Sequence, residues 1–574
     1  MKRYLKYAKP YWLFFILAPC LMMIEVYAEV KIPSLAGKII DAFVSGTSAQ
    51  VITGYGLSML LHVAIALIGG IGCAFFATRA GVYFSSDLRR DLFKKIQTFS
   101  FANIDRFGNA SLVTRLTNDI IQIQGMVEMS LRMCFRAPGM LIGTLIMAFS
   151  LNNYLASIFV VLIPILVSII GVIVYLSFKR FTVFQVKIDK LNKVIRESLT
   201  NIRVIKSLAR EDEEIGKFQD ANAELKKSGL RAFGMTMLQM PLITFFINLA
   251  TIMVLYLSGV GIENGNVQIG DISVFVTYTT QILMSLMMLT QVFITGSRAA
   301  ACAKRVEEVF DTTPDILDNN SSTKSSLISG NISFKDVNFR YYKDNKENVL
   351  NDINLDINSG ETVGIIGSTG CGKSTLISLI PRLYDVDSGE VLIDGKNVKD
   401  YSLKELRDNI SVVLQNNVLF SGTIENNLLW GDENASPNEI RIASSNAAAD
   451  DFVSKFKDGY NTRVSQGGVN FSGGQKQRLC IARALLKKPK VLILDDSTSA
   501  VDTATEARIR NYLTNELSST TKIIIAQRIS SVVMADKIIV MNDGSIEAIG
   551  SHDNLLDSCT TYKEIYDSQM GSSL

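Results

Sequence analysis

Six long apolar segments alternate with polar connections in the first half of the chain. They cover residues 12–42, 52–83, 137–151, 155–178, 241–260 and 272–294. An α-helix needs about 20 apolar residues to cross a hydrocarbon core of roughly 30 Å, and most of these segments are that long. The third is shorter, and its helix is expected to begin near Met129. The pattern therefore predicts six membrane-spanning helices in a lipid bilayer.

Basic residues are distributed unevenly among the connections. Those at 43–55, 150–153 and 259–271 contain no lysine or arginine, whereas the intervening connections are rich in both. Because positively charged connections stay on the cytoplasmic side, both chain termini are predicted to be cytoplasmic. We expect a multi-pass protein of a bacterial plasma membrane. The first apolar segment has no small-residue cleavage site, which favours a retained helix over a signal peptide.

The two cytoplasmic connections are long and free of proline. No proline occurs between residues 34 and 137 or between residues 165 and 240. A single helix over residues 55–101 would be about 70 Å long, more than twice the thickness of the hydrocarbon core. We therefore expect the helices to continue into the cytoplasm, with short elements at 108–119 and 205–218 that reverse the chain direction.

Two acidic residues lie inside the first apolar segment. Glu25 and Glu29 are one helical turn apart, and ionisable groups at membrane depth are candidates for substrate contact. The alternative is that they pair with Lys31 or with a neighbouring helix. In the last segment, Met284 and Met288 offer a soft, polarisable lining for apolar ligands. Core or lipid-facing packing is the alternative for these methionines.

The second half of the chain has a different composition. Residues 311–329 are rich in Asp, Asn, Ser and Thr and predict a linker, and strand-like and helix-like stretches alternate beyond it, as in an α/β domain. The formal net charge of +3 gives no indication of a nucleic-acid partner. Seven scattered cysteines without metal-ligand spacing favour a reduced cytosol for this half.

A glycine-rich motif lies between a strand-like stretch at 362–366 and a helix-like stretch at 376–383. It consists of Gly367, Ser368, Thr369, Gly370, Cys371, Gly372, Lys373, Ser374 and Thr375. This fits the P-loop pattern G-x-x-x-x-G-K-[ST] in the context that the motif requires. Its backbone N–H groups are expected to surround phosphates, with Lys373 at the β- and γ-phosphates and Ser374 at Mg²⁺. Because Cys371 lies in the loop, a bulky thiol reagent should block nucleotide binding.

Further motifs complete a pattern that resembles the ABC exporter family. They are Tyr341; Gln415; Ser472, Gly473, Gly474 and Gln475; Asp495; and residues 499–502. The resemblance implies that Tyr341 stacks on adenine and that Gln415 senses Mg²⁺ and the γ-phosphate. It implies that the signature at 472–475 reaches the partner's nucleotide. Asp495 would belong to the magnesium shell, and residues 499–502 would form the D-loop. ATP and Mg²⁺ are the implied cofactors.

The resemblance covers nearly the whole chain and implies a half-transporter with a multi-domain fold. An all-α transmembrane domain of six helices would occupy residues 1–310. A linker at 311–329 and an α/β P-loop ATPase domain at 330–574 would follow. The elements at 108–119 and 205–218 resemble coupling helices, of which the second contacts the partner's ATPase domain. A small apolar or amphipathic compound would be the substrate.

Two residues depart from the family pattern. Asp496 stands where the catalytic glutamate is expected, and Gln527 stands where the switch histidine is expected. An aspartate is shorter than a glutamate by one C–C bond, about 1.5 Å, which is enough to misalign a group that must position water. Glutamine can donate a hydrogen bond to phosphate but does not carry the charge of imidazolium.

These departures predict a heterodimer. The partner would supply the glutamate and histidine of a hydrolytic site that this chain's signature completes, whereas this chain's own Walker site would be impaired. The stretch at 465–468, before the signature, resembles the same asymmetric subgroup of bacterial multidrug exporters. A homodimer of modest activity is the alternative. Lipid or peptide transport, or an ATP-binding regulatory half-transporter, are alternatives to multidrug export.

Overall fold

The computed structural model describes residues 2–263, 265–318, 329–341, 347–496 and 501–570. Over these residues the chain forms two compact units. The helical unit comprises Met1–Gln97 and Ala110–Asp311, and the α/β unit comprises Thr98–Asn109 and Thr312–Leu574. The predicted fold class, an all-α membrane domain followed by an α/β domain, is confirmed. Residues 319–328 of the predicted linker lie outside the described residues.

The helical unit is built from long helices and a few short ones. They are α1 (Lys2–Ala8), α2 (Trp12–Val44), α3 (Ala49–Gln97), α5 (Asn109–Thr114), α6 (Ile120–Leu151), α7 (Asn153–Thr200), α8 (Ile202–Ser207), α9 (Glu211–Met237), α10 (Gln239–Glu263) and α11 (Ile269–Asp311). A π-helical turn (Arg115–Asp119) joins α5 to α6. Among the described residues, six helical stretches are long and apolar enough to cross a membrane, as the sequence predicted.

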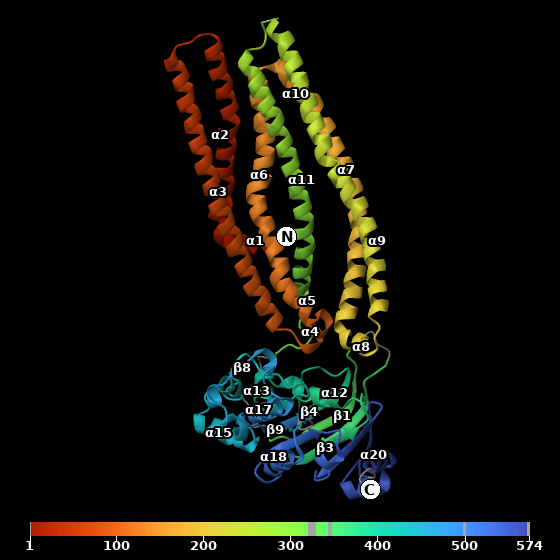
Figure 1. Cartoon of the computed structure of the whole chain (residues 1–574). Coiled ribbons are helices and arrows are strands. Elements are labelled where there is room, and N and C mark those ends of the chain that lie inside the picture. Colours follow the sequence, from red (N-terminus) through yellow and green to blue (C-terminus); the bar gives the residue numbers. More distant parts are fainter. Residues whose placement is uncertain (1, 264, 319–328, 342–346, 497–500, 571–574) are drawn as a thin grey trace. The chain divides into compact units, whose positions relative to one another are not determined.

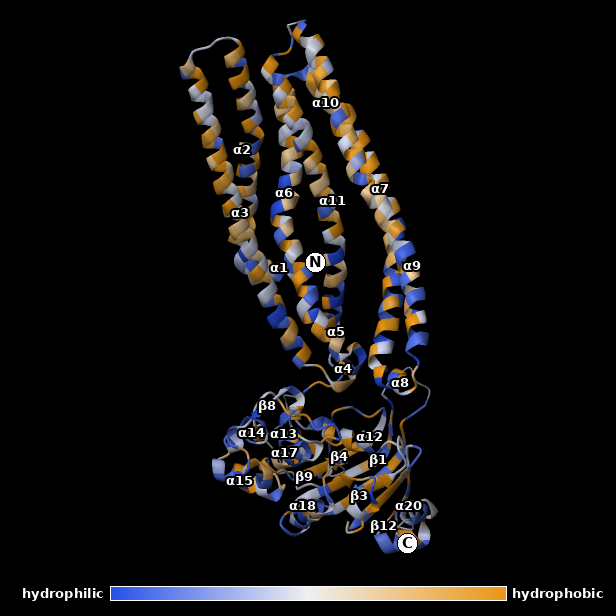
Figure 2. Ribbon diagram, in the orientation of Figure 1, coloured by the Kyte–Doolittle hydropathy of each residue, from blue (hydrophilic) through white to orange (hydrophobic). Residues whose placement is uncertain are grey.

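These helices pack in pairs. Helix α2 lies along α3, α6 along α11, and α7 along α9 and α10 (Figure 1). The residues of α10 and of the adjoining part of α7 are mostly hydrophobic, whereas many residues of α9 are hydrophilic (Figure 2). At 1.5 Å per residue, the 49 residues of α3 exceed the thickness of a hydrocarbon core. The helices therefore extend beyond the apolar layer, as predicted.

The elements that reverse the chain lie earlier than the sequence predicted. The first reversal is made by α4 (Phe101–Phe107) and not by residues 108–119. Residues 109–119 instead begin the long helical stretch that continues into α6. Ser100 and Asn103 form a capping box at the start of α4, and Gly108, with φ 74°, ends it. Glycine adopts this left-handed conformation without steric cost, so it terminates a helix well.

The second reversal has a different physical origin. Helix α8 precedes α9, and most of the predicted element at 205–218 belongs to α9. Four acidic residues, Glu211 to Glu214, occupy the first turn of α9. Negative charge there stabilises a helix N-terminus, so this charged stretch starts a long helix instead of forming a short separate one.

The α/β unit contains two main sheets. The first has the order β2-β1-β4-β5 and is antiparallel; the second has the order β12-β11-β3-β10-β9-β6 and is parallel except for β12. Their strands are β1 (Ile332–Phe339), β2 (Leu350–Ile357), β3 (Thr362–Gly367), β4 (Ser388–Ile393), β5 (Lys396–Asn397), β6 (Ile410–Val413), β9 (Val491–Asp495), β10 (Thr521–Ile525), β11 (Lys537–Asn542) and β12 (Ser545–Gly550).

Helices and a small ribbon complete this unit. The helices are α12 (Lys373–Leu379), α13 (Leu403–Asn409), α14 (Ile424–Leu428), α15 (Pro437–Asn446), α16 (Asp450–Val453), α17 (Gly473–Leu486), α18 (Thr503–Asn515), α19 (His552–Ser558) and α20 (Thr560–Met570). Strands β7 (Gly422–Thr423) and β8 (Arg463–Val464) pair with each other.

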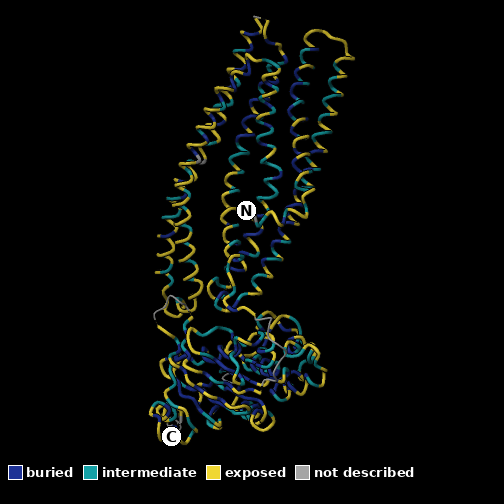
Figure 3. The backbone as a smooth tube through the Cα atoms, turned by 180° about the vertical axis from the view of Figure 1, so that it is seen from behind, coloured by how far each residue is buried: buried dark blue, intermediate teal, exposed yellow. Residues whose placement is uncertain are grey.

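The core of the α/β unit lies within and between the two sheets. Strand β9 is buried along its whole length, as expected for a parallel strand that is covered on both faces. Phe334 of the first sheet and Ile365 and Ile493 of the second belong to one buried cluster. Figure 3 shows buried residues gathered in the interior of this unit and exposed ones at its periphery. A second cluster surrounds α17 and packs it against α15.

Candidate nucleotide-binding site

The predicted motifs meet at one edge of the parallel sheet. The P-loop follows β3, Asp495 ends β9, Gln527 lies two residues after β10, and Gln415 lies two residues after β6. These four strands are neighbours in the order β3-β10-β9-β6, and Ile525 of β10 pairs with Asp495 in register. Because parallel strands present their carboxyl ends at the same edge, residues far apart in sequence form one site.

The P-loop adopts the turn that its glycines permit. Gly370 and Gly372 have φ values of 87° and 95°, and a Cβ at Gly367 would lie 2.1 Å from the carbonyl oxygen of Met541. The ammonium of Lys373 donates to the carbonyl oxygens of Gly367 and Ser368, at 2.8 and 2.7 Å. The loop therefore closes around the ammonium of Lys373, the group that the motif predicts to contact the β- and γ-phosphates.

Two oxygen groups are placed for a divalent cation. The Ser374 hydroxyl donates to Oδ1 of Asp495 at 3.1 Å, and Asp495 is buried. Burial raises the pKa of this carboxyl above its ordinary value. A hydroxyl and a carboxylate in contact are the oxygen ligands that Mg²⁺ prefers. Ser374 and Asp495 thus fit the ion, and a positive charge here would offset the cost of the buried carboxylate.

Asp496 and Gln527 contact each other directly. The Gln527 side-chain amide donates to Oδ2 of Asp496 at 2.9 Å, and Gln415 forms a side-chain hydrogen bond with the same carboxylate. Burial is the main cause that raises the pKa of Asp496. The Gln569 side chain accepts from the backbone N–H of Ile529 and donates to the carbonyl of Gln527, both at 2.8 Å. Asp496 is therefore tied to residues from two neighbouring strand ends.

Tyr341 lies beside the P-loop helix. Its hydroxyl is hydrogen-bonded to Oγ1 of Thr375 at 2.9 Å. Its ring meets Phe339 and Tyr384 edge to face, at centroid distances of 5.0 and 5.1 Å. The side chain remains 38% exposed, so part of the ring is accessible for stacking. The structure thus places this aromatic residue beside the predicted phosphate loop, and its stacking on adenine stays a prediction.

The signature forms the start of α17. The Ser472 hydroxyl accepts from the Gln475 backbone N–H at 3.3 Å, and the Ser472 N–H donates to the Gln475 side chain at 3.0 Å. This capping box leaves Ser472 and Gly473 exposed. Residues 499 and 500 of the predicted D-loop lie outside the described residues. Of the remaining two, Val501 is buried and Asp502 caps α18.

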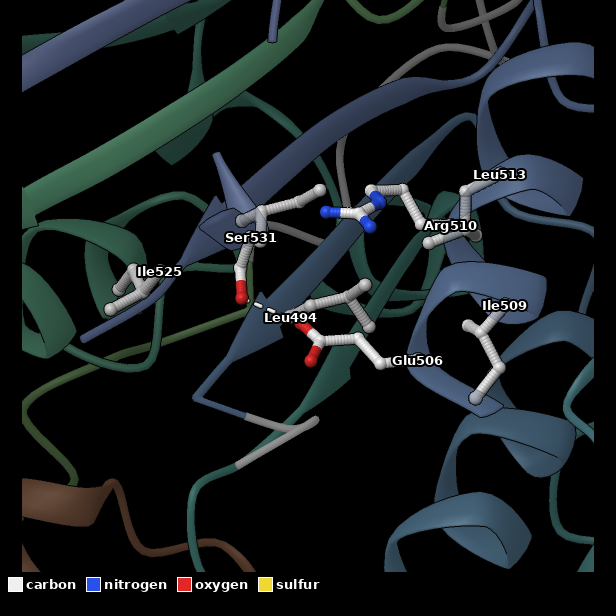
Figure 4. Close-up of a pocket in the computed structure, with 8 residues that line it drawn as sticks. Leu494, Glu506, Ile509, Arg510, Leu513, Ile525 and Ser531 are labelled. Carbon is white, nitrogen blue, oxygen red and sulfur yellow. Dashed lines mark hydrogen bonds between the residues drawn. The ribbon is translucent and has the colours of Figure 1, made fainter. Parts of the chain in front are cut away.

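The sequence did not indicate how the segment after Gln527 is fixed. Figure 4 shows Glu506 of α18 and Ser531 pointing toward each other across a cavity of about 20 Å³. The Ser531 hydroxyl donates to Glu506 at 2.5 Å, and Arg510 donates to the carbonyl of Ser530. The cavity is too small for a nucleotide. These contacts join α18 to the turn that follows Gln527.

The sequence also missed an arginine in the helical unit. Arg136 of α6 forms ion pairs with Glu25 and, at 2.7 Å, with Glu29 of α2. The two glutamates thus pair with a neighbouring helix, one of the alternatives considered from sequence. Met284 is 53% exposed and Met288 is partly buried. The sequence does place Arg136 immediately before an apolar segment whose helix was expected to begin near Met129. This indicates a charge at membrane depth but does not identify the glutamates as its partners.

Comparisons with known proteins agree with this arrangement. Residues 15–286 match the ABC transporter transmembrane region, and residues 350–499 match the ABC transporter family. The chain is 38% identical over 571 residues to "Uncharacterized ABC transporter ATP-binding protein YfiB" of Bacillus subtilis (strain 168), covering 100% of this chain and 99% of the relative. It is 32% identical over 576 residues to "Putative multidrug export ATP-binding/permease protein YgaD" of the same organism, covering 99% and 98%.

A solved structure is similar over the whole length. "Structure of a bacterial Atm1-family ABC exporter with ATP bound" aligns with a TM-score of 0.76 and 25% identity, covering 99% of both chains. The fold and the site together define a membrane protein with an ATP-binding motor domain. The chain belongs to the ABC transporter family and is an ABC exporter half-transporter, whose ATPase domain couples ATP hydrolysis to transport.

Proposed function

We propose that this chain is one subunit of a heterodimeric exporter of apolar or amphipathic compounds. The observation that carries the proposal is the hydrogen bond between Gln527 and Asp496 at 2.9 Å. A general base must reach the attacking water with a free carboxylate oxygen. Here the shorter carboxylate is occupied by two glutamine side chains, which is unfavourable for proton abstraction.

This chain's own Walker site is suited to retaining a nucleotide without hydrolysing it. Lys373, Ser374 and Asp495 keep the arrangement of a phosphate and Mg²⁺ site, so ATP binding does not require Asp496. When bound, Mg²⁺ would neutralise charge on the nucleotide phosphates. Tight binding with slow turnover is the expected behaviour of this chain's own Walker site.

The signature of this chain supports a role in ATP hydrolysis at the partner's nucleotide site. Ser472 caps an intact helix of 14 residues and is exposed together with Gly473. An exposed helix N-terminus favours contact with phosphate oxygens. In a head-to-tail dimer, this surface would complete the partner's site, where the partner would contribute glutamate and histidine.

Coupling to the membrane domain would begin at α4. The Tyr384 hydroxyl donates to Asp105 of α4 at 2.7 Å, and its ring lies 6.0 Å from that of Phe101. Asn103 donates to Asp315 at 2.9 Å. These contacts make α4 part of the α/β unit. They favour α4 as the first coupling helix, in place of residues 108–119.

The heterodimer is tested by purifying this chain alone and together with a half-transporter encoded next to it, and by measuring the ATPase activity of each preparation. We expect ATPase activity near background for the chain alone and robust turnover for the pair. In the pair, replacing the partner's catalytic glutamate by glutamine should remove most turnover. Robust turnover by the chain alone would refute the heterodimer, and retained turnover in the partner variant would show that Asp496 is competent.

Apolar or amphipathic cargo is supported by the multidrug export name of a relative at 32% identity. Transport of fluorescent amphiphiles into inside-out vesicles tests it. The vesicle orientation also tests whether both termini are cytoplasmic in a bacterial plasma membrane, because added protease should then cleave the α/β unit. A chain that binds ATP but adds no transport to its partner would instead be a regulatory half-transporter.

A further inference from the structure

A groove of about 460 Å³ runs between α2 and α6 in the helical unit. Its floor is apolar, because Val26 and Val30 of α2 are almost fully buried there. A Cβ at Gly139 would lie 3.4 Å from Val26, and one at Gly143 would lie 3.5 Å from Val30. The small residues of α6 therefore leave room above a closely packed floor. The volume lies within the range of sites that hold drug-sized ligands.

The groove contains two hydrogen-bond donors on one helix face. Tyr27 and Lys31 both line it, and residues four apart are neighbours on a helix surface. Within the described part of the chain, neither side chain has a hydrogen-bonding or ionic partner. No acidic residue lines the groove. A lysine in a membrane-spanning helix usually forms an ion pair or contacts water. An anionic ligand would therefore stabilise the ammonium of Lys31.

The nearest acidic residues on α2, Glu25 and Glu29, already form ion pairs with another residue. Arg136 pairs with both Glu25 and Glu29, and these residues do not line the groove. The charge of the groove is thus set by Lys31. A phenol and an ammonium one turn apart can donate two hydrogen bonds to one carboxylate, sulfate or phosphate group.

We propose that this groove binds an amphipathic anion, with its acidic head at Tyr27 and Lys31 and its apolar body along Val26, Val30 and Gly143. The inference rests on the proposed export function and assigns that exporter a preference for lipophilic acids. The occupant is a transported amphiphile that enters from solution or from the membrane, and a resident bilayer lipid is the alternative that the experiment distinguishes.

A binding measurement tests the groove without a partner or ATP. The full chain is placed in phosphatidylcholine nanodiscs and titrated with 11-(dansylamino)undecanoic acid or its methyl ester, with empty discs subtracted. We expect Lys31→Met to weaken binding of the acid roughly tenfold and Tyr27→Phe about threefold, because a hydrogen bond to a charged group is lost. Binding of the ester should change little.

Two variants control the measurement. Lys31→Arg keeps the charge and should retain acid binding. Lys38→Met removes a lysine from the same helix outside the groove and should have no effect. Equal weakening of acid and ester, or no effect of Lys31→Met in a protein with unchanged thermal unfolding, would overturn the proposal. Displacement of the acid by phosphatidylglycerol, but not by soluble decanoate, would identify a bilayer lipid and would also overturn it.

A transport assay distinguishes failure of the groove assignment from failure of the proposed export function. In proteoliposomes that contain the chain and its partner, the acid should be exported in preference to the ester. Export of the ester without preference for the acid would refute the groove assignment while leaving the exporter intact. A complete lack of amphiphile export, with acid binding retained, would refute the proposed function alone.

Discussion

Lengthening the carboxylate at position 496 should restore hydrolysis to this chain's Walker site. In the structure, Asp496 is hydrogen-bonded to Gln527 at 2.9 Å and follows the buried Asp495 in sequence. Asp496→Glu adds one C–C bond, about 1.5 Å. The longer side chain can extend past the Gln527 amide toward the position of the attacking water.

The size of the effect follows from alignment. A misplacement of about 1 Å in a catalytic group costs roughly 10²-fold in rate. Correcting a displacement of this size should therefore increase turnover by about 10²-fold, equivalent to about 2.7 kcal/mol in the activation free energy. Asp496→Glu with Gln527→His should increase it further, since imidazole restores a group that can carry positive charge.

Steady-state phosphate release measures this increase. The variant is combined with a partner whose own catalytic glutamate is replaced by glutamine, so that only this chain's Walker site can turn over. Asp496→Asn is the matched control and should stay at the wild-type level. If Asp496→Glu leaves turnover unchanged while a fluorescent ATP analogue still binds normally, the missing methylene does not limit hydrolysis and the argument fails.

Four further changes have expected outcomes. Arg136→Ala should lower the free energy of unfolding by about 3–5 kcal/mol, because it leaves two glutamates unpaired; a loss below 1 kcal/mol in denaturant unfolding would contradict the ion-pair assignment. Asp495→Asn should raise the unfolding temperature of the nucleotide-free protein at pH 7 but abolish its stabilisation by Mg-ATP. The raised pKa of this carboxyl means that the folded state favours the protonated form, so its contribution to stability is lost as pH rises through that pKa. Tyr384→Phe removes the hydrogen bond to Asp105 and should reduce transport per ATP hydrolysed, whereas unchanged stoichiometry would argue against coupling through α4. A bulky maleimide on Cys371 should block ATP binding, and ATP should protect it; normal binding after stoichiometric labelling would exclude this pocket.

The sequence was sufficient where the pattern is local. Apolar segment length determined the six spans, since a helix must satisfy its own backbone hydrogen bonds in lipid. The P-loop was predicted from its pattern after a strand-like stretch, and Asp495 and Gln415 were predicted from the resemblance to the family. The structure places all three at the carboxyl ends of parallel strands, which lie at one edge of the sheet. The turning elements were placed too late, at 108–119 and 205–218. A few residues decide where these helices begin and end, namely Ser100 and Gly108 at α4 and the acidic first turn of α9.

What the sequence could not give were contacts between distant residues. Nothing local to Glu25 indicates Arg136, which is 111 positions away, and nothing local to Phe101 indicates Tyr384. The contact between Gln527 and Asp496 likewise depends on adjacent strands β10 and β9. Sequence determined which groups this protein has for binding ATP and for crossing a membrane. Tertiary structure decided which charges neutralise one another and which remain available, because electrostatic and hydrogen-bond energies depend on distances that only the folded chain sets.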